Sequence, residues 1–240
     1  MKKTLLTICL VWMCFSLSAQ KIIDLSGKWS FSIDRQDNGE KEKWFSHTLN
    51  DFINLPGSMP EKLKGDEVTA KTQWTGSLYD SSYYYNPYME KYRKEGNIKF
   101  PFFLTPDKHY VGAAWYQKEV NIPADWKGER ILLFLERPHI ETTVWVNGQK
   151  TGMQNSLCVP HQYDITRYVR PGKCTITIRV DNRIKEINVE PDSHSITDQT
   201  QGNWNGIVGR ICLQTTPKTY CLLYASDAAD ELDGVELGGR

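Results

Sequence analysis

The stretch SITDQTQGNWNGIVGRI, residues 195–211, gathers side chains that can form hydrogen bonds with the hydroxyl groups of a ligand. Carboxylates and amides accept from or donate to adjacent hydroxyls, and an aromatic ring can cover an apolar C–H face. The plainer interpretation is a tight turn before a strand, because glycine adopts positive φ and asparagine tolerates it. The candidate side chains are Asp198, Gln199, Gln201, Asn203, Trp204 and Asn205.

Other residues that could do chemistry show no spacing typical of a catalytic or metal site. The five histidines share no metal-ligand spacing and lie in no nucleophile motif, so we expect core or surface roles for them. The odd set Cys158, Cys174 and Cys212 has no CxxC spacing and predicts neither a disulfide framework nor a zinc site. We therefore expect no metal and no cofactor.

Both ends of the chain differ from its middle. Lys2 and Lys3 precede an apolar run over residues 5–15 and the small residues of SLSAQ, which predicts a secretory signal peptide over residues 1–19. The mature protein is then secreted or periplasmic, and no second long apolar run predicts a membrane span. Residues 221–240 lack strand alternation and resemble a translated sequencing adapter, which favours a non-native tail over a native acidic one that lacks the apolar content to fold.

The remaining residues, 20–220, are enough for one domain with a substantial core. The 29 basic and 29 acidic residues of the sequence cancel, so the charge does not indicate a nucleic-acid partner.

Alternating apolar residues predict that this domain is almost wholly β. In KWSFSI, Trp29, Phe31 and Ile33 fall on one face of a strand, and CTITIRV repeats the pattern from Cys174 to Val180. TVWVNGQKTG predicts a hairpin around Asn147-Gly148, with Trp145 on the opposite face from its valine neighbours. Short strands joined by Gly, Pro and Asn turns indicate an antiparallel sandwich.

Four motifs in one order carry a resemblance to a known family. LSGKWSFSID, AAWYQKEVNIPADWKGERILLFLERPHIETTVWVNGQKTG, PHQYDITRYVRPGKCTITIRVDN and NWNGIVGRICL resemble the N-terminal domain of glycoside hydrolase family 2 enzymes, which include β-galactosidases and β-glucuronidases. The resemblance spans nearly all of residues 24–214. It implies an all-β jelly-roll sandwich of the galactose-binding type, followed in the family by an immunoglobulin-like domain and a catalytic TIM barrel.

The resemblance also implies a role for the opening stretch. In the family, the loop before the GI-x-x-R strand reaches the mouth of the barrel and touches the sugar, so we expect Asp198, Gln201, Asn203, Trp204 and Asn205 to bind substrate. The alternative is a loop that only packs against the barrel. In β-galactosidases an acidic residue lies close before the tryptophan, whereas Gly202 and Asn203 stand there in this sequence.

The resemblance places the catalytic carboxylates on the barrel, so this chain should contain none of them. Glu136, Glu141 and Asp181 lie on or beside predicted strands and match no family catalytic motif. The chain is thus expected to be the substrate-flanking domain of a secreted β-glycoside hydrolase. The alternative is a stand-alone carbohydrate-binding or interaction module.

An aromatic segment, residues 74–103, is a second candidate binding surface. It holds Trp74 and six of the twelve tyrosines within 30 residues. Such amphipathic rings suit either a carbohydrate platform or an interface between domains, and a loop of this length is commonly functional.

Overall fold

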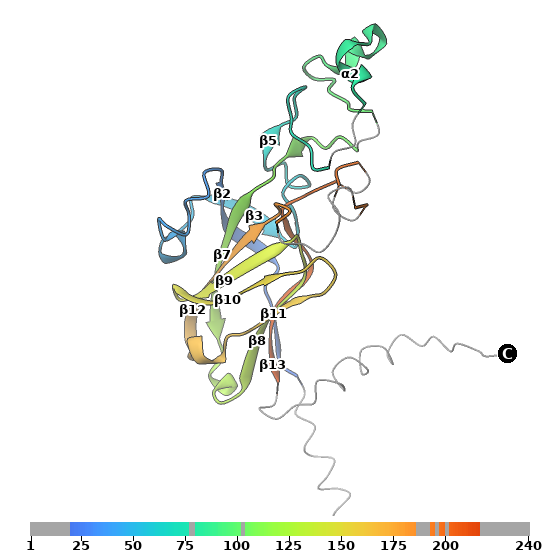
Figure 1. Cartoon of the computed structure of the whole chain (residues 1–240). Coiled ribbons are helices and arrows are strands. Elements are labelled where there is room, and N and C mark those ends of the chain that lie inside the picture. Colours follow the sequence, from blue (N-terminus) through green and yellow to red (C-terminus); the bar gives the residue numbers. More distant parts are fainter. Residues whose placement is uncertain are drawn as a thin grey trace, which may run out of the picture.

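Two antiparallel β-sheets packed face to face form the body of the molecule (Figure 1), in a computed structural model that describes residues 20–76, 80–101, 104–185, 193–194, 197–199 and 202–216. The predicted signal peptide, the predicted non-native tail and Gln201 lie outside these ranges.

The larger sheet has the strand order β10-β9-β12-β7-β2-β3, and the smaller has the order β1-β13-β8-β11 with β4 paired to β13. Every recorded strand pair is antiparallel. The predicted antiparallel β-sandwich is therefore confirmed. The strands are β1 (Ile22–Asp24), β2 (Gly27–Asp34), β3 (Asp51–Leu55), β4 (Gly57–Ser58), β5 (Asp66–Glu67), β6 (Lys108–His109), β7 (Ala113–Ile122), β8 (Arg130–Pro138), β9 (Glu141–Val146), β10 (Gln149–Asn155), β11 (His161–Asp164), β12 (Gly172–Asp181) and β13 (Gly206–Thr216).

In the described part of the chain, the helical elements are single turns or little more. They are the α-helix α2 (Ser82–Tyr85) and the 3-10 helices η1 (Trp44–Ser46), η2 (Pro87–Tyr92), η3 (Ala124–Trp126) and η4 (Thr166–Tyr168). Within the ranges given above, no helix is long and apolar enough to cross a bilayer.

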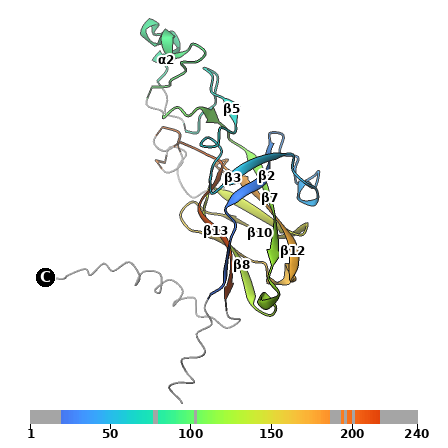
Figure 2. The same ribbon diagram turned by 180° about the vertical axis from the view of Figure 1, so that it is seen from behind.

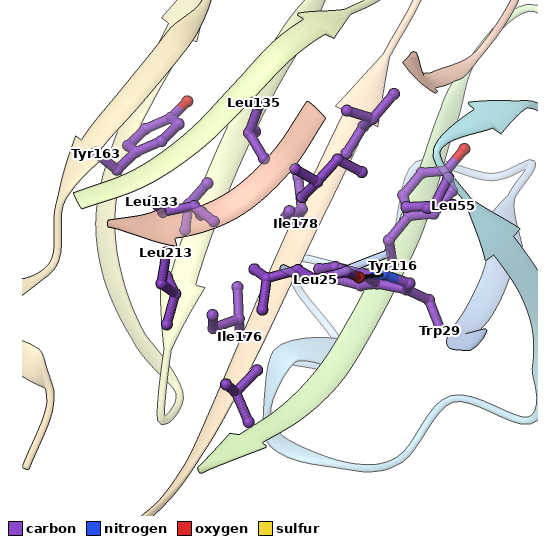
Figure 3. Packing of buried hydrophobic residues seen from close by; sticks show 14 of the residues in the cluster. Leu25, Trp29, Leu55, Tyr116, Leu133, Leu135, Tyr163, Ile176, Ile178 and Leu213 are labelled. Atoms are coloured by element: carbon purple, nitrogen blue, oxygen red, sulfur yellow. Dashed lines mark hydrogen bonds between the residues drawn. The ribbon is translucent and has the colours of Figure 1, made fainter. Parts of the chain in front are cut away.

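The core lies between the two sheets and follows the period-two pattern of the sequence. Trp29 on β2 and Ile176 and Ile178 on β12 face Leu133 on β8 and Leu213 on β13 (Figure 3), and all five are buried. Alternate side chains of a strand point to opposite faces, so one apolar residue in two is enough to fill this layer. The strand faces predicted for KWSFSI and CTITIRV are confirmed.

The outer face of the larger sheet carries a second, smaller aromatic cluster. Trp115 on β7 and Trp145 on β9 point away from the core, and the segment between β2 and β3 folds over them. Phe45 stacks on Trp145 with ring centroids 5.2 Å apart, and the Trp115 indole donates to the Asp34 carboxylate at 2.9 Å. Trp145 lies on the opposite face of β9 from the core residues Val144 and Val146. It is nevertheless buried because the segment between β2 and β3 covers this face.

The hairpin predicted at Asn147-Gly148 joins β9 to β10. Both turn residues have positive φ, 50° and 77°, as a type I′ turn requires.

The segment from β5 to β6, residues 66–109, projects beyond one end of the sandwich with α2 at its tip (Figures 1 and 2). We call this segment the arm; residues 77–79 and 102–103 within it are not described. It contains the predicted aromatic segment and packs its own rings, because Phe100 lies 4.9 Å from Trp74 and 4.6 Å from Tyr83 between ring centroids. Three further tyrosines on the arm remain exposed: Tyr84, Tyr85 and Tyr88.

Gly39 provides a test of the outer layer. A β-carbon at this position would lie 2.5 Å from the Trp115 indole nitrogen and 2.7 Å from the Asp34 carboxylate. We expect Gly39→Ala to lower the free energy of unfolding by about 1–3 kcal/mol, the usual effect of overpacking, as measured by urea denaturation.

Gly152→Ala is the matched control, because its added β-carbon would meet only the Tyr163 ring at an ordinary 3.6 Å. That variant should be unchanged or more stable by up to about 1 kcal/mol. Equal stabilities for the two variants would show that the Asp34 and Trp115 contact does not hold the segment in place.

Candidate functional site

The loop between β12 and β13 carries the residues predicted to bind substrate. We call residues 197–205 the site loop; residues 200 and 201 within it are not described. It lies at the end of the sandwich from which the arm projects, since its Asp198 amide donates to the Thr75 carbonyl at 3.1 Å. The site loop and the root of the arm therefore form one surface.

Asp198 is buried, and both of its carboxylate oxygens are used inside the chain. Oδ2 accepts from the Thr75 backbone amide at 2.7 Å and lies 3.2 Å from Nε2 of His109. Oδ1 accepts from the Asn203 backbone amide at 2.5 Å. A buried carboxylate without partners is strongly unfavourable, and here three groups satisfy it. Asp198 thus ties the site loop to the arm.

The side chains of Asn203 and Asn205 are buried as well. The side-chain nitrogen of Asn203 donates to the Thr75 hydroxyl at 2.9 Å and to the Asn182 backbone carbonyl at 3.0 Å. The Asn205 amide nitrogen donates to two backbone carbonyls, and its oxygen accepts from the Tyr116 hydroxyl at 2.7 Å. These amides hold the loop in one conformation.

Asn182, directly after β12, completes this buried network. Its side-chain oxygen accepts from the Gly112 amide at 2.8 Å. Its amide nitrogen donates to the Tyr110 carbonyl at 2.9 Å and to Asn203 Oδ1 at 3.0 Å. Neither Asn182 nor His109 stands out in the sequence, because their partners lie between 21 and 89 residues away along the chain.

Trp204 and Gln199 are the described loop candidates that remain partly exposed. The Trp204 indole stacks on the imidazole of His139, with ring centroids 4.6 Å apart and planes 18° apart. Burial lowers the pKa of His139 to about 4, although the Asn203 side chain and the Asp198 charge act to raise it. A neutral imidazole therefore supports the indole near neutral pH, and the partly exposed ring is suited to an apolar sugar face.

The three acidic residues singled out in the sequence, Asp181, Glu141 and Glu136, are engaged in ion pairs or hydrogen bonds. Asp181 contacts Arg179, Arg183 and Lys185; burial acts to raise its pKa, but hydrogen bonds from the last two hold that pKa well below the usual range. Glu136 accepts from the Arg210 backbone amide at 2.6 Å. Such carboxylates hold the fold together and lack the environment of a proton donor.

No group of three or more His, Cys, Asp or Glu side chains that could hold a metal occurs among the described residues. Around the site loop, the Trp204 ring and the Gln199 side-chain amide can contact a ligand, and buried hydrogen bonds beneath them hold the loop in place.

Comparison with known proteins identifies what the chain resembles. Residues 22–217 match the model of the glycosyl hydrolases family 2, sugar binding domain. A β-glucuronidase from Paenibacillus borealis is 27% identical over 164 residues, which cover 68% of this chain and 21% of the relative. A β-galactosidase from Priestia megaterium is 24% identical over 212 residues, covering 87% of this chain and 18% of the relative.

A solved β-glucuronidase structure from an uncultured Clostridium species has the same fold, with a TM-score of 0.55 and 21% identity over 84% of this chain and 30% of that one. The chain thus spans less than a third of the length of the proteins it matches.

The buried contacts of Asp198 lead to a stability prediction. Asp198→Ala removes the carboxylate that the Thr75 and Asn203 backbone amides and the His109 imidazole contact. We therefore expect the free energy of unfolding to fall by about 2–4 kcal/mol. Gln199→Ala, on the same loop, removes no recorded hydrogen bond and should stay within about 0.5 kcal/mol of the parent sequence. Chemical denaturation of both variants is the test, and equal values would refute the anchoring role of Asp198.

Proposed function

This chain belongs to the sugar binding domains of glycosyl hydrolases family 2, and we propose from this premise that it is the amino-terminal domain of a longer, secreted β-glycoside hydrolase. The proposal rests on the family match over residues 22–217 and on the small share of each relative that the chain spans. The relatives named above are two β-glucuronidases and a β-galactosidase, so a β-linked sugar is the substrate class we propose. Export rests on the basic and apolar leader over residues 1–19.

In the longer protein, the catalytic acid and nucleophile are supplied by other domains. Retaining glycosidases need two carboxyl groups about 5 Å apart, and Asp181, Glu141 and Glu136 are each occupied with cations or backbone amides. Our proposal assigns to this domain one wall of the sugar site. We also propose that the native residues of this chain run to about Tyr220 and that residues 221–240 are a non-native tail.

The single observation that carries the wall assignment is the partly exposed Trp204 that stacks on buried His139. Trp204 covers the apolar face of the sugar, and Gln199 donates to or accepts from a hydroxyl. Asp198, Asn203 and Asn205 support this wall from beneath, since their polar atoms are turned inward. Gln201 belongs to the same proposed surface.

The chain by itself should release no nitrophenol above buffer from galactoside, glucuronide, mannoside or rhamnoside reporters, because our proposal assigns proton transfer and the stabilisation of transition-state charge to other domains. One wall also leaves most of a sugar hydrated, so calorimetry should find no binding tighter than about millimolar.

Hydrolysis that disappears on changing one carboxylate within residues 20–220 would overturn the assignment of catalysis to other domains. Micromolar glycan binding without hydrolysis would instead favour a stand-alone carbohydrate-binding module.

In the longer enzyme, Gln199→Ala should lower kcat/KM by about tenfold, because one hydrogen bond to substrate is worth on the order of 1–2 kcal/mol. Trp204→Leu should lower it by a similar or larger factor. Matched controls at a distance are Gln149→Ala, on the exposed edge strand β10, and Trp44→Leu, in the outer aromatic cluster.

Steady-state kinetics with thermal midpoints for all four variants is the measurement. If the loop variants and their controls give the same kcat/KM, the site loop has only a packing role.

A further inference from the structure

A polar cleft of about 430 Å³ lies at the root of the arm. Its walls come from Arg35 directly after β2, from β5, from β6 with the two residues that follow it, and from the stretch 69–73. Trp204 and Gln199 are not part of these walls, so the cleft is distinct from the surface of the site loop that we assign to substrate. Pockets that bind small molecules commonly have volumes of about 300–1,000 Å³.

His109 connects this cleft to the site loop. The ring is 6% exposed and lines the cleft, while Trp74 packs against it with centroids 4.7 Å apart. Its Nε2 faces Asp198, and a carboxylate only accepts hydrogen bonds, so Nε2 is the donor. In the neutral ring Nδ1 is then an acceptor, and no hydrogen bond to it is found within the described part of the chain.

Fixed charges around the cleft occur as pairs. Arg35 contacts Asp66 through Nε and Nη2, at 3.1 and 2.5 Å, and Lys108 contacts Glu67. Neither sign of charge is left in excess, so an ionic ligand of either sign would meet a like charge beside its partner. The cleft therefore favours a neutral ligand.

The uncharged groups of the cleft are suited to hydroxyls. Thr69 and Thr72 supply hydroxyl groups whose oxygens accept from the Lys71 and Thr69 backbone amides at 3.1 and 2.9 Å, and whose protons remain as donors. The exposed Gln73 side chain supplies an amide that makes one long 3.3 Å contact to the Lys71 carbonyl. Hydroxyls and amides both donate and accept, as the adjacent OH groups of a sugar do. Together with the acceptor at His109, they form a set with the hydrogen-bonding character of a polyol site.

We propose that this cleft is a second carbohydrate-binding site that takes one neutral sugar unit. A ligand hydroxyl donates to Nδ1 of His109, and the Gln73 amide bonds to a neighbouring hydroxyl. The other ring nitrogen, Nε2, contacts Asp198, so the His109 imidazole separates the ligand from the buried carboxylate of the site loop. The site uses residues of this chain alone, so binding there can be measured without the other domains of the longer protein.

Nuclear magnetic resonance titration of the ¹⁵N-labelled full chain tests the proposal. The probes are methyl β-glucopyranoside, methyl β-galactopyranoside and sodium glucuronate. We expect at least one of the two neutral glycosides to shift the His109 Nδ1 resonance and the Thr72 and Gln73 amides in a saturable way, at millimolar concentrations. Glucuronate should bind more weakly than that glycoside.

Two variants make the test specific. Gln73→Ala, an exposed change that should not affect folding, is expected to raise the dissociation constant by about threefold or more, the loss of one modest hydrogen bond. His109→Gln keeps a donor for Asp198 but removes the free ring nitrogen, and should do the same. Gln149→Ala is the control and should leave binding unchanged.

Shifts confined to Gln199 and Trp204 would overturn the cleft proposal and leave the site loop as the sugar surface. Absence of saturable shifts at the cleft with both glycosides would also overturn it, and tighter binding of glucuronate would refute the neutral ligand class. Because no catalytic assay is involved, failure here is separate from failure of the proposed glycosidase function.

Discussion

A carboxylate shut off from water needs hydrogen-bond donors on its oxygens, and Asp198 finds them only because three segments of the chain meet around it. Thr75 and His109 come from the two ends of the arm, and Asn203 comes from the site loop itself. Removing any one segment would leave a buried charge short of partners. The position of the arm and the conformation of the loop that carries Trp204 therefore depend on the same contact.

The sandwich supplies the rigid base on which that contact is built. Asn182 follows the last residue of β12, and Asn205 precedes the first residue of β13, so the buried amides begin where the strand ladders end. Backbone groups that leave a sheet must find other partners, and here side-chain amides provide them. The result is a stiff platform with a partly exposed indole at its surface. This arrangement is the structural basis of the sugar wall that we propose.

Much of the fold could be predicted from the sequence because its cause is local. Alternation in KWSFSI and CTITIRV sets which face of β2 and β12 is buried, and Asn147-Gly148 sets the hairpin. Residue types and the family resemblance identify the site loop as a candidate binding surface. They do not predict which of its side chains point inward and which outward. Asp198 could not be predicted to be buried, because its partner Thr75 lies 123 residues away. His109 gave no sequence signal for a related reason, since its role depends on a partner 89 residues away.

The central claim is that the site loop presents Trp204 to a sugar from a base of buried polar contacts. Radical footprinting of the longer enzyme with mass-spectrometric detection tests it directly, with and without a non-hydrolysable thioglycoside of its substrate. The account predicts that the Trp204 side chain is oxidised in the free enzyme and protected when the thioglycoside binds, while Trp145 in the outer cluster stays protected in both states. Oxidation of Trp204 that does not change on binding the thioglycoside would contradict the account.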